Sequence, residues 1–376
     1  MSGSAPETRA PADAPPTGPA RWYVAEALDH PCRALFAAAG SPPAEAAHEA
    51  RLRVRANLGG HDSHGVVRVS QYLRNVRRGR VVPGAEPTTL RDHGAALRLS
   101  GNWGYGQTAT ARALALGVER ARTHKAVAVG ISELNHNGRL ADYLGPTLEA
   151  GMIALLFAAS SGFNTLVAPF GGAERRLNTN PFAAGFPSGG GAPVVFDIAT
   201  SASSQGRMKV LVDAGRPAPA GVLIDAQGAP STDPRDLYRG GAILPFGGEQ
   251  GYKGYLLNLL VEVLGGILTD GGFMGHPKRD AGGQCLLAIL LDVSAFRALP
   301  DFQRELAQLI AYLKATGPLP GQTVLAPGEA SARREAERRR GGIELPAATV
   351  ADLQAELDHY ALPMDLAAQG HAAPLG

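Results

Sequence analysis

Residues 62–72 read Asp62-Ser63-His64-Gly65-Val66-Val67-Arg68-Val69-Ser70-Gln71-Tyr72, and this stretch is the most informative part of the chain. His64, Arg68 and Tyr72 are spaced four residues apart, which on a helix places three polar side chains on one face. An imidazole exchanges protons near neutral pH, and a guanidinium holds a carboxylate through two parallel hydrogen bonds. The stretch therefore indicates a site for a small carboxylate that exchanges a proton. The alternative is a surface helix with incidental polar residues.

The composition predicts a globular chain with a substantial core. Apolar residues make up 45% of 376 positions, enough for two or three lobes or one large elaborated domain. The formal charge of +2 gives no reason to expect nucleic acid or a membrane surface as a partner. The basic run 333–340 contains two glutamates, which is typical of a solvated helix face.

The cysteines and the chain ends predict a cytoplasmic protein. Cys32 and Cys285 are far apart and lack metal-ligand spacing, so we expect a reducing compartment and no zinc site. The N-terminus has no apolar core of the signal-peptide type, and the Pro- and Ala-rich residues 1–20 predict a disordered tail. The apolar stretch 255–268 is interrupted by Asn258, Glu262 and two glycines, which predicts a buried helix and not a membrane span.

Helical and strand patterns alternate along the chain. Apolar spacing predicts helices over 22–58, with a break at residues 40–43, and over 108–125, and a C-terminal helix with a stripe formed by Phe302, Leu306, Leu309 and Leu313. Short apolar runs predict strands at 97–99, 126–131, 152–158, 194–198 and 285–293. This alternation is typical of the α/β class.

One motif resembles a Rossmann fingerprint without its context. Residues 104–109 match Gly-x-Gly-x-x-Ala after a short strand and before a helix. The ribose-binding acid is expected about twenty residues further on, and Glu133 comes later than that. We therefore expect an ordinary strand-to-helix turn here.

Other polar groups stand where ligands are often bound. Asn135-His136-Asn137-Gly138-Arg139 directly follows a predicted strand, so His136 is a second acid or base, or else a satisfied structural histidine. Asn178-Thr179-Asn180-Pro181 offers amide groups in a turn. Asp197 ends an apolar run, as a ribose acceptor, an orienter of a histidine or a helix cap.

Two further candidates precede helices. Lys253 could meet a phosphate or a carboxylate, or it is an exposed loop lysine. Pro327-Gly328-Glu329 begins a helix whose backbone N–H groups suit a phosphate.

Taken together, these pieces resemble the malate/L-lactate dehydrogenase family of the non-Rossmann type, which includes sulfolactate and ureidoglycolate dehydrogenases, diketogulonate reductase and piperideine/pyrroline-2-carboxylate reductases. The matching segments follow one order over roughly residues 22–345: Asp62–Val66, Asn135-His136 with Gly138-Arg139, Pro169–Gly172, Thr179–Pro181, Ser231–Pro234, Pro245–Gly248, Tyr252–Gly254 and Pro327–Glu329.

The resemblance implies a non-Rossmann α/β fold of the sulfolactate-dehydrogenase-like type that binds NAD(H) or NADP(H). It implies a tail at 1–20, an N-terminal helical lobe at 21–125, a central cofactor domain at 126–317 and a C-terminal helical return at 318–376. It also implies a homodimer in which the second subunit helps to close the active-site cleft.

The resemblance implies hydride transfer between nicotinamide and C2 of a 2-oxo or 2-hydroxy acid, or of a cyclic 2-imino acid. His64 and His136 are the acid/base candidates, and their order stays open. Ser63, Arg68 and Tyr72 would bind the substrate carboxylate. The implied cofactor contacts are Asn180, Val195, Phe196, Asp197, Ile198, Ala199, Lys253, Gly328 and Glu329, with no metal. The 2′-phosphate of NADP could meet Arg175, Arg176 or Arg207, so the choice of cofactor stays open.

Two positions depart from the family pattern. Asn137 stands where relatives usually have an aromatic residue, and Asn178 where they usually have glycine. Asn tolerates left-handed backbone, so Asn178 is expected to keep that turn. A polar Asn137 favours a substrate other than plain malate or lactate, such as a bulkier 2-oxo acid or a cyclic imine. The remaining rival is a cofactor-binding protein without catalysis.

Overall fold

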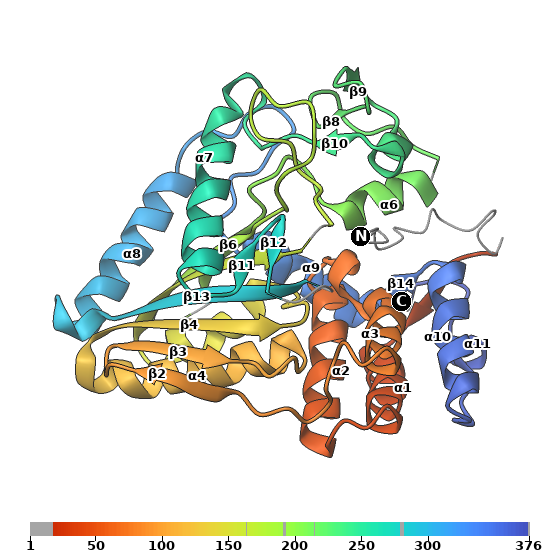
Figure 1. Ribbon diagram of the computed structural model, residues 1–376, viewed down its shortest axis with the longest axis horizontal. Helices are drawn as coiled ribbons and strands as arrows, with labels where there is room; N and C mark the ends of the chain where they lie inside the picture. Colours follow the sequence, from red (N-terminus) through yellow and green to blue (C-terminus); the bar gives the residue numbers. More distant parts are fainter. Residues whose placement is uncertain (1–17, 163, 191–192, 214, 279–281, 375–376) are drawn as a thin grey trace.

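The computed structural model describes residues 18–374, apart from 163, 191–192, 214 and 279–281. Of the predicted disordered tail, residues 1–17 lie outside this description. The centre of the molecule is a seven-stranded sheet in the order β2-β3-β4-β13-β5-β6-β7 (Figure 1). Its strands are β2 (Thr88–Asp92), β3 (Ala96–Ser100), β4 (Ala126–Leu134), β5 (Met152–Ser161), β6 (Phe182–Phe186), β7 (Val194–Ile198) and β13 (Gly283–Asp292).

The sheet is mixed, and a late strand fills its middle. β3 and β4 run parallel, whereas β13 pairs antiparallel with β4 on one side and β5 on the other. Ile289 of β13 lies between Ala128 of β4 and Leu155 of β5. The apolar runs therefore form strands, as predicted, and β2 and β3 bring residues from before position 125 into the same sheet as the central segment.

Helices cover both faces of this sheet. α4 (Gly106–His124) and α5 (Leu144–Glu149) pack on one face, where Leu114, Val129 and Leu290 belong to the largest buried cluster. Gly117 lets α4 approach closely, because a Cβ there would lie 3.0 Å from Val129. On the other face lie α7 (Tyr252–Val261) and the π-helical turn η6 (Glu262–Ile267). Helix α8 (Leu299–Lys314) is drawn to the left of α7 in Figure 1.

The two chain ends fold together beside the sheet. Strand β1 (Arg21–Tyr23) pairs antiparallel with β14 (Ile343–Leu345). A second buried cluster joins Leu28 and Leu73 to Leu353. The helices of this lobe are α1 (Ala25–Ala38), α2 (Pro43–Leu58), α3 (Val69–Arg77), α9 (Glu329–Gly341), α10 (Ala347–His359) and α11 (Leu366–Gln369). The division at residues 125 and 317 stays a prediction.

A small subdomain stands above the helical lobe (Figure 1). Its strands β8 (Leu223–Ile224), β9 (Pro230–Ser231) and β10 (Ala242–Ile243) form one sheet beside η4 (Pro234–Arg239) and α6 (Gln205–Asp213). Helix α6 reaches the 62–72 region, since a Cβ on Gly206 would lie 2.8 Å from Ser63 Cβ. The remaining elements are η5 (Gly248–Gln250), β11 (Gly272–Phe273), β12 (His276–Pro277) and η7 (Val293–Ala295).

Three local predictions need correction. Residues 62–72 do not form one helix: η1 (Asp62–His64) and η2 (Val66–Arg68) are separate 3₁₀ turns before α3, divided at Gly65 by extended backbone. The segment 255–268 is helical, but not buried, since Leu256 is 55% and Leu268 61% exposed. Among the described residues the left-handed position of the 178–181 turn is Asn180 (φ 35°), not Asn178.

No helix within the described residues is long and apolar enough to cross a membrane.

Candidate active site

Asn57, on the last turn of α2, shapes the double 3₁₀ turn. Its Nδ2 donates to Asp62 Oδ1 at 2.7 Å, and its Oδ1 accepts from the Val66 N–H at 2.9 Å. Gly65 lies between these two contacts, where a Cβ would sit 2.2 Å from Asn57 Oδ1. The Asp-Ser-His-Gly motif thus needs its glycine for close approach, and the amide fixes both ends of the turn.

Arg338 holds the same turn from the C-terminal helix α9. Its guanidinium donates to both Asp62 carboxylate oxygens, at 2.6 and 3.0 Å, and to the Asn57 carbonyl at 2.5 Å. This fork geometry suits a carboxylate. A residue more than 270 positions away thereby orients the segment that carries His64.

The second histidine enters from the loop after β4. Asn135 anchors this loop by donating from Nδ2 to the carbonyls of Arg80 and Trp103 at 2.9 and 2.8 Å. Gly106, in the false Rossmann motif, lets α4 begin directly against the loop, since a Cβ there would lie 2.7 Å from the His136 carbonyl. The predicted strand-to-helix turn therefore exists, and its glycine serves close packing.

The structure brings both candidate histidines together. The rings of His64 and His136 stack at 5.7 Å between centroids, with 22° between their planes. Ser63 Oγ lies 3.0 Å from His64 Nδ1, and the Tyr72 hydroxyl lies 2.6 Å from His136 Nδ1. The two segments therefore lie side by side, and their role as one site stays a prediction.

Arg68 and Tyr72 have different surroundings. Arg68 Nε donates to the Ser63 carbonyl at 2.7 Å and Nη1 to Gln71 Oε1 at 2.7 Å, so the guanidinium is oriented and carries no carboxylate within 4.0 Å among the described residues. The Tyr72 hydroxyl is instead engaged by His136 and by the buried Arg53, whose Nη1 lies 2.8 Å away. Of these two side chains, Arg68 is therefore the one whose charge stays available for a substrate carboxylate.

Both histidines are neutral at neutral pH in this structure. Desolvation, reinforced by the Arg68 charge, lowers the pKa of His64 to about 3. The same two causes hold the pKa of His136 well below its usual value. Reduction of a ketone requires a protonated imidazole. Without substrate, neither histidine is therefore in the protonated state that reduction needs. Bound negative charge at Arg68 would oppose this shift.

Asn180 forms a buried polar cluster below the turn 178–181. Its Nδ2 donates to Asn258 Oδ1 at 2.8 Å and to the Glu262 carboxylate. Glu262 also accepts from the Met274 N–H at 2.8 Å, while burial raises its pKa. Asn180 Oδ1 is buried and has no hydrogen-bond partner within the described part of the chain. An orphaned acceptor of this kind suits a ligand that brings an N–H group.

The edge strand β7 carries the other predicted dinucleotide contacts. Val195, Phe196 and Ala199 are half-buried, and Ile198 is 43% exposed. Asp197 Oδ2 accepts from the Ala141 N–H at 3.0 Å, at the start of η3 (Leu140–Tyr143). Asp197 thus holds the first residues of η3, an earlier turn in the chain whose own N-cap residue is Arg139. Burial raises the pKa of Asp197 to about 6.

Gly328 meets the same strand from α9. It occupies the N-cap in left-handed backbone (φ 89°), and a Cβ there would lie 3.0 Å from the Pro193 carbonyl and 3.1 Å from Val195. Glu329 pairs with Lys314 and Arg333 at 2.8 and 2.6 Å, which holds its pKa near 2. These residues line one edge of the sheet, whereas Lys253 stands exposed in the first turn of α7.

Asn137 is buried beside His136. The Asn137 side chain is 1% exposed, and both of its amide atoms lack partners among the described residues. Its Oδ1 lies against the first turn of α4, 2.6 Å from where a Gly106 Cβ would be. Its backbone N–H donates to Gln284 Oε1 at 2.6 Å, and its carbonyl accepts from the Tyr143 hydroxyl.

Several residues at this site were not predicted from the sequence: Arg53, Asn57, Gln107, Gly206 and Arg338. Arg53 carried a signal, because it falls on the buried stripe of α2, three residues after Ala50. A charge on an apolar stripe indicates a buried partner. Arg338 lies in a basic run with glutamates, and nothing in that pattern singles it out.

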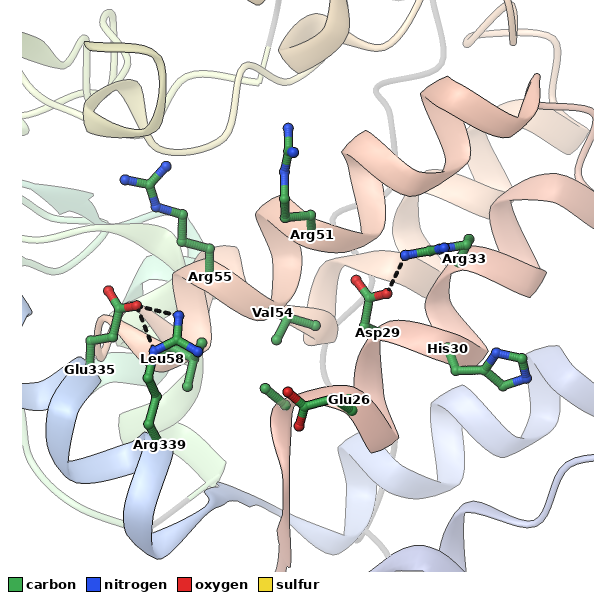
Figure 2. A pocket seen from close by; sticks show the side chains of 11 residues that line it. Glu26, Asp29, His30, Arg33, Arg51, Val54, Arg55, Leu58, Glu335 and Arg339 are labelled. Atoms are coloured by element: carbon green, nitrogen blue, oxygen red, sulfur yellow. Dashed lines mark hydrogen bonds and ion pairs between the residues drawn. The ribbon is translucent and has the colours of Figure 1, made fainter. Parts of the chain in front are cut away.

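A groove of about 700 Å³ between α1, α2 and α9 is a different place. Figure 2 shows two ion pairs in it, Arg33 with Asp29 and Arg339 with Glu335, while Glu26, Arg51 and Arg55 have no marked partner there. It contains neither candidate histidine. Within the described ranges no three His, Cys, Asp or Glu side chains gather as metal ligands.

Comparison with known proteins identifies the family. The model for malate/L-lactate dehydrogenase matches residues 24–354. The chain belongs to the malate/L-lactate dehydrogenase family. It is therefore an oxidoreductase, as the resemblance implied, and the family's dehydrogenases depend on a nicotinamide cofactor.

Relatives in this family include both proposed chemistries. Hydroxycarboxylate dehydrogenase B of Escherichia coli is 34% identical over 86% of this chain and 90% of its own. A Delta(1)-pyrroline-2-carboxylate/Delta(1)-piperideine-2-carboxylate reductase of Pseudomonas syringae is 34% identical over 87% and 94%. The solved structure of a malate/lactate dehydrogenase from E. coli covers 93% of this chain and 98% of its own, with a TM-score of 0.86 at 32% identity. The predicted non-Rossmann fold is thereby confirmed.

Proposed function

We propose that this malate/L-lactate dehydrogenase family member transfers a hydride between NAD(H) or NADP(H) and C2 of a 2-oxo or 2-hydroxy acid. The observation that carries the proposal is the stacked pair His64 and His136 beside the oriented Arg68 guanidinium. Two imidazole rings next to an oriented cation suit a small carboxylate whose C2 oxygen needs a hydrogen bond and a proton.

Arg68 binds the substrate carboxylate and Ser63 lends a hydrogen bond. The Ser63 carbonyl and Gln71 hold two sides of the guanidinium, so it keeps one orientation and presents C2 in one pose. Tyr72 supports the site through His136. This replaces the expectation that the Tyr72 hydroxyl contacts the carboxylate.

The neutral histidines set the order of events. In oxidation a neutral imidazole accepts the C2 hydroxyl proton as the hydride leaves for the nicotinamide, and in reduction both return. For reduction an imidazole must first gain a proton. Burial is the larger cause of both low histidine pKa values and the Arg68 charge is the second. A carboxylate on Arg68 would cancel the second cause, so substrate binding would favour protonation of the histidines.

The nicotinamide cofactor fits the edge formed by β7 and the start of α9. The orphaned Oδ1 of Asn180 is an acceptor for an amide N–H. The N-terminus of α9 behind Gly328 favours negative charge. Val195 to Ala199 supply an edge strand, and Lys253 and Glu329 stand as further contacts. Arg176 pairs with Glu174, and Arg175 donates to the Leu237 carbonyl. Because both side chains already have partners, neither favours NADP(H) over NAD(H) as a ligand of the 2′-phosphate.

The second candidate function is reduction of a cyclic 2-imino acid. A relative that is a Delta(1)-pyrroline-2-carboxylate/Delta(1)-piperideine-2-carboxylate reductase supports it, as does the buried amide of Asn137, which has no hydrogen-bond partner among the described residues. An imine reacts in its protonated form and depends less on an acid, but equally on Arg68.

We also propose that the protein acts as a homodimer. Large apolar side chains stand exposed along α7, η6 and α8: Leu256, Leu259, Leu260, Val263, Ile267, Leu309 and Tyr312. Exposed large apolar side chains on adjoining elements such as α7 and η6 are typical of an interface between subunits.

A substrate panel tests the proposed function. Pyruvate, oxaloacetate, a bulkier 2-oxo acid and piperideine-2-carboxylate are each mixed with enzyme and NADH or NADPH, and absorbance of the reduced nicotinamide is followed. We expect the reduced nicotinamide to be oxidised faster with a bulkier 2-oxo acid or with the imine than with pyruvate or oxaloacetate. A clear preference for oxaloacetate would refute the proposed substrate class. No oxidation of the reduced cofactor with any substrate of the panel would refute the proposed activity.

A further inference from the structure

A buried cation stands directly behind the candidate active site. Arg53, on α2, is 1% exposed. Burial disfavours its charge, but the neighbouring Tyr72 and the buried Glu49 favour it, so that the pKa of Arg53 is raised. Its Nη1 donates to the Tyr72 hydroxyl at 2.8 Å, and its guanidinium carbon lies 4.9 Å from the centre of the Tyr72 ring. A buried charge is costly, so its retention needs a reason.

The hydrogen bonds between Arg53 and His136 have one direction. A guanidinium has only donors, so the Tyr72 oxygen accepts from Arg53. The Tyr72 O–H then points to an acceptor, and His136 Nδ1 lies 2.6 Å away. The Gln107 amide is farther, at 3.2 Å: its Nε2 donates to the Tyr72 oxygen, and only with the amide turned over does its oxygen become an acceptor for the Tyr72 O–H. The Gly138 backbone N–H, which is also only a donor, approaches the same Nδ1 at 3.2 Å. Two donors aimed at Nδ1 leave the ring proton on Nε2.

His64 has no such constraint. Its Nδ1 faces the Ser63 hydroxyl at 3.0 Å, and a hydroxyl both donates and accepts. Either neutral tautomer and the imidazolium are therefore accommodated. The charged groups that act on His64 are Arg68, Arg53 and Arg139, with His61. Those that act on His136 are Arg68, His64 and Arg53.

We propose that Arg53 is a positioning residue that fixes the His136 proton on Nε2, so that His136 is a constant hydrogen-bond donor to the substrate oxygen and His64 exchanges the proton. This inference rests on the proposed function and assigns different roles to the two histidines. The donor polarises the C2 oxygen in both directions, while the proton enters and leaves through His64.

Nitrogen-15 NMR of histidine-labelled protein tests the tautomer without any substrate. The His136 signals are identified by their loss in His136→Gln. We expect Nε2 protonated and Nδ1 bare in the wild type, and a larger share of the Nδ1-protonated tautomer in Arg53→Met. Arg53→Lys keeps a donor for Tyr72 and should restore the wild-type pattern. A proton on Nδ1 in the wild type, or an unchanged tautomer in Arg53→Met, overturns the proposal.

The matched control is Arg51→Met, on the same helix but with its guanidinium exposed beside the groove (Figure 2). It should leave the His136 signals unchanged. If Arg53→Met does not fold, Tyr72→Phe, which removes the hydroxyl between Arg53 and His136, takes its place with the same expected shift of tautomer.

Kinetics supply the second readout. Arg53→Met should lower kcat about 10–100-fold, as loss of an orienting partner does, with KM changed less than about threefold. His64→Asn should abolish the pH dependence of kcat, whereas His136→Asn should lower kcat and keep that dependence. The reverse assignment of the pH dependence overturns the division of roles. Absence of turnover refutes the proposed function, and the NMR result still decides the proton position.

Discussion

The Arg338 guanidinium of α9 grips the Asp62 carboxylate with two hydrogen bonds, at 2.6 and 3.0 Å, two residues before His64. The same helix begins at Gly328, which packs on β7, the strand we propose for the dinucleotide. One helix therefore touches both the proposed cofactor edge and the turn that carries a histidine. The C-terminal segment is part of the site and not only a cover for the helical lobe.

Arg338→Ala should lower kcat/KM about tenfold or more, because the η1 turn loses its bidentate anchor and Asn57 alone remains to hold it. Arg338→Lys retains charge without the fork and should recover only part of the rate. The control is Arg340→Ala, an exposed position on the same helix. Steady-state rates for all three, at equal melting temperature, check this. Equal rates for Arg338→Ala and the control would contradict it.

Arg68→Ala should raise KM about thirtyfold, corresponding to about 2 kcal/mol of lost carboxylate binding. The Gln71 side chain and Ser63 carbonyl then lose only a neighbour, so the fold should persist. KM is measured at saturating cofactor. A KM within twofold of the wild type would show that the carboxylate binds elsewhere.

Stability should fall below neutral pH because of the histidines. His64 has a folded pKa of about 3, against about 6.5 when unfolded, and that of His136 also lies below the usual value. The unfolded chain therefore binds more protons below pH 6.5, and the stabilisation is lost as pH falls toward the folded values. Glu49 acts oppositely: burial raises its pKa to about 7, so its contribution is lost as pH rises from about 4.5.

His64→Asn isolates the histidine term. The urea midpoint is measured for wild type and variant at about pH 7.5 and about pH 5.0, both within the range that His64 spans. The drop on acidification should be smaller in the variant, since every other group is unchanged. Equal drops in the two proteins would mean that His64 is not buried as a neutral ring.

Charged substitutions on the exposed apolar face of α7 and η6 test the proposed subunit interface. Wild type should have twice the 39.0 kDa mass of the chain in light scattering, and Leu256→Glu combined with Val263→Glu should give monomer, because two carboxylates on the α7–η6 face cannot be buried without partners. Val82→Glu, an exposed apolar position in another part of the chain, is the control. A monomeric wild type, or an unchanged dimer in the double variant, would contradict the proposed interface.

The sequence predicts where the helices and strands lie better than it predicts which strands pair and which helix faces are covered. The apolar runs around Val129, Leu156 and Ile289 mark strands by burial alone, but period and composition do not say that β13 inserts between β4 and β5. Similarly, the segment 255–268 is apolar enough to suggest burial, and only the fold shows that Leu256 and Leu268 face outward.

In the candidate active site, too, the local patterns were predictable from the sequence and the long-range contacts were not. Four-residue spacing of His64, Arg68 and Tyr72 marks them as a group, although Gly65 and its contact with Asn57 break the predicted helix into two turns. His136 was found from its place after a strand. Arg53 and Arg338 act through side chains far along the chain, and such contacts have no local pattern.

Rapid mixing with the best substrate of the panel tests the central claim most directly. Enzyme preloaded with reduced cofactor is mixed with substrate, and nicotinamide absorbance is followed for wild type, His64→Asn and Arg68→Ala. We predict a fast single-turnover decay in the wild type, a decay slowed at least about a hundredfold in His64→Asn, as general acid catalysis contributes, and a decay that needs far more substrate in Arg68→Ala. Unchanged decay in both variants would contradict the site described by His64, His136 and Arg68.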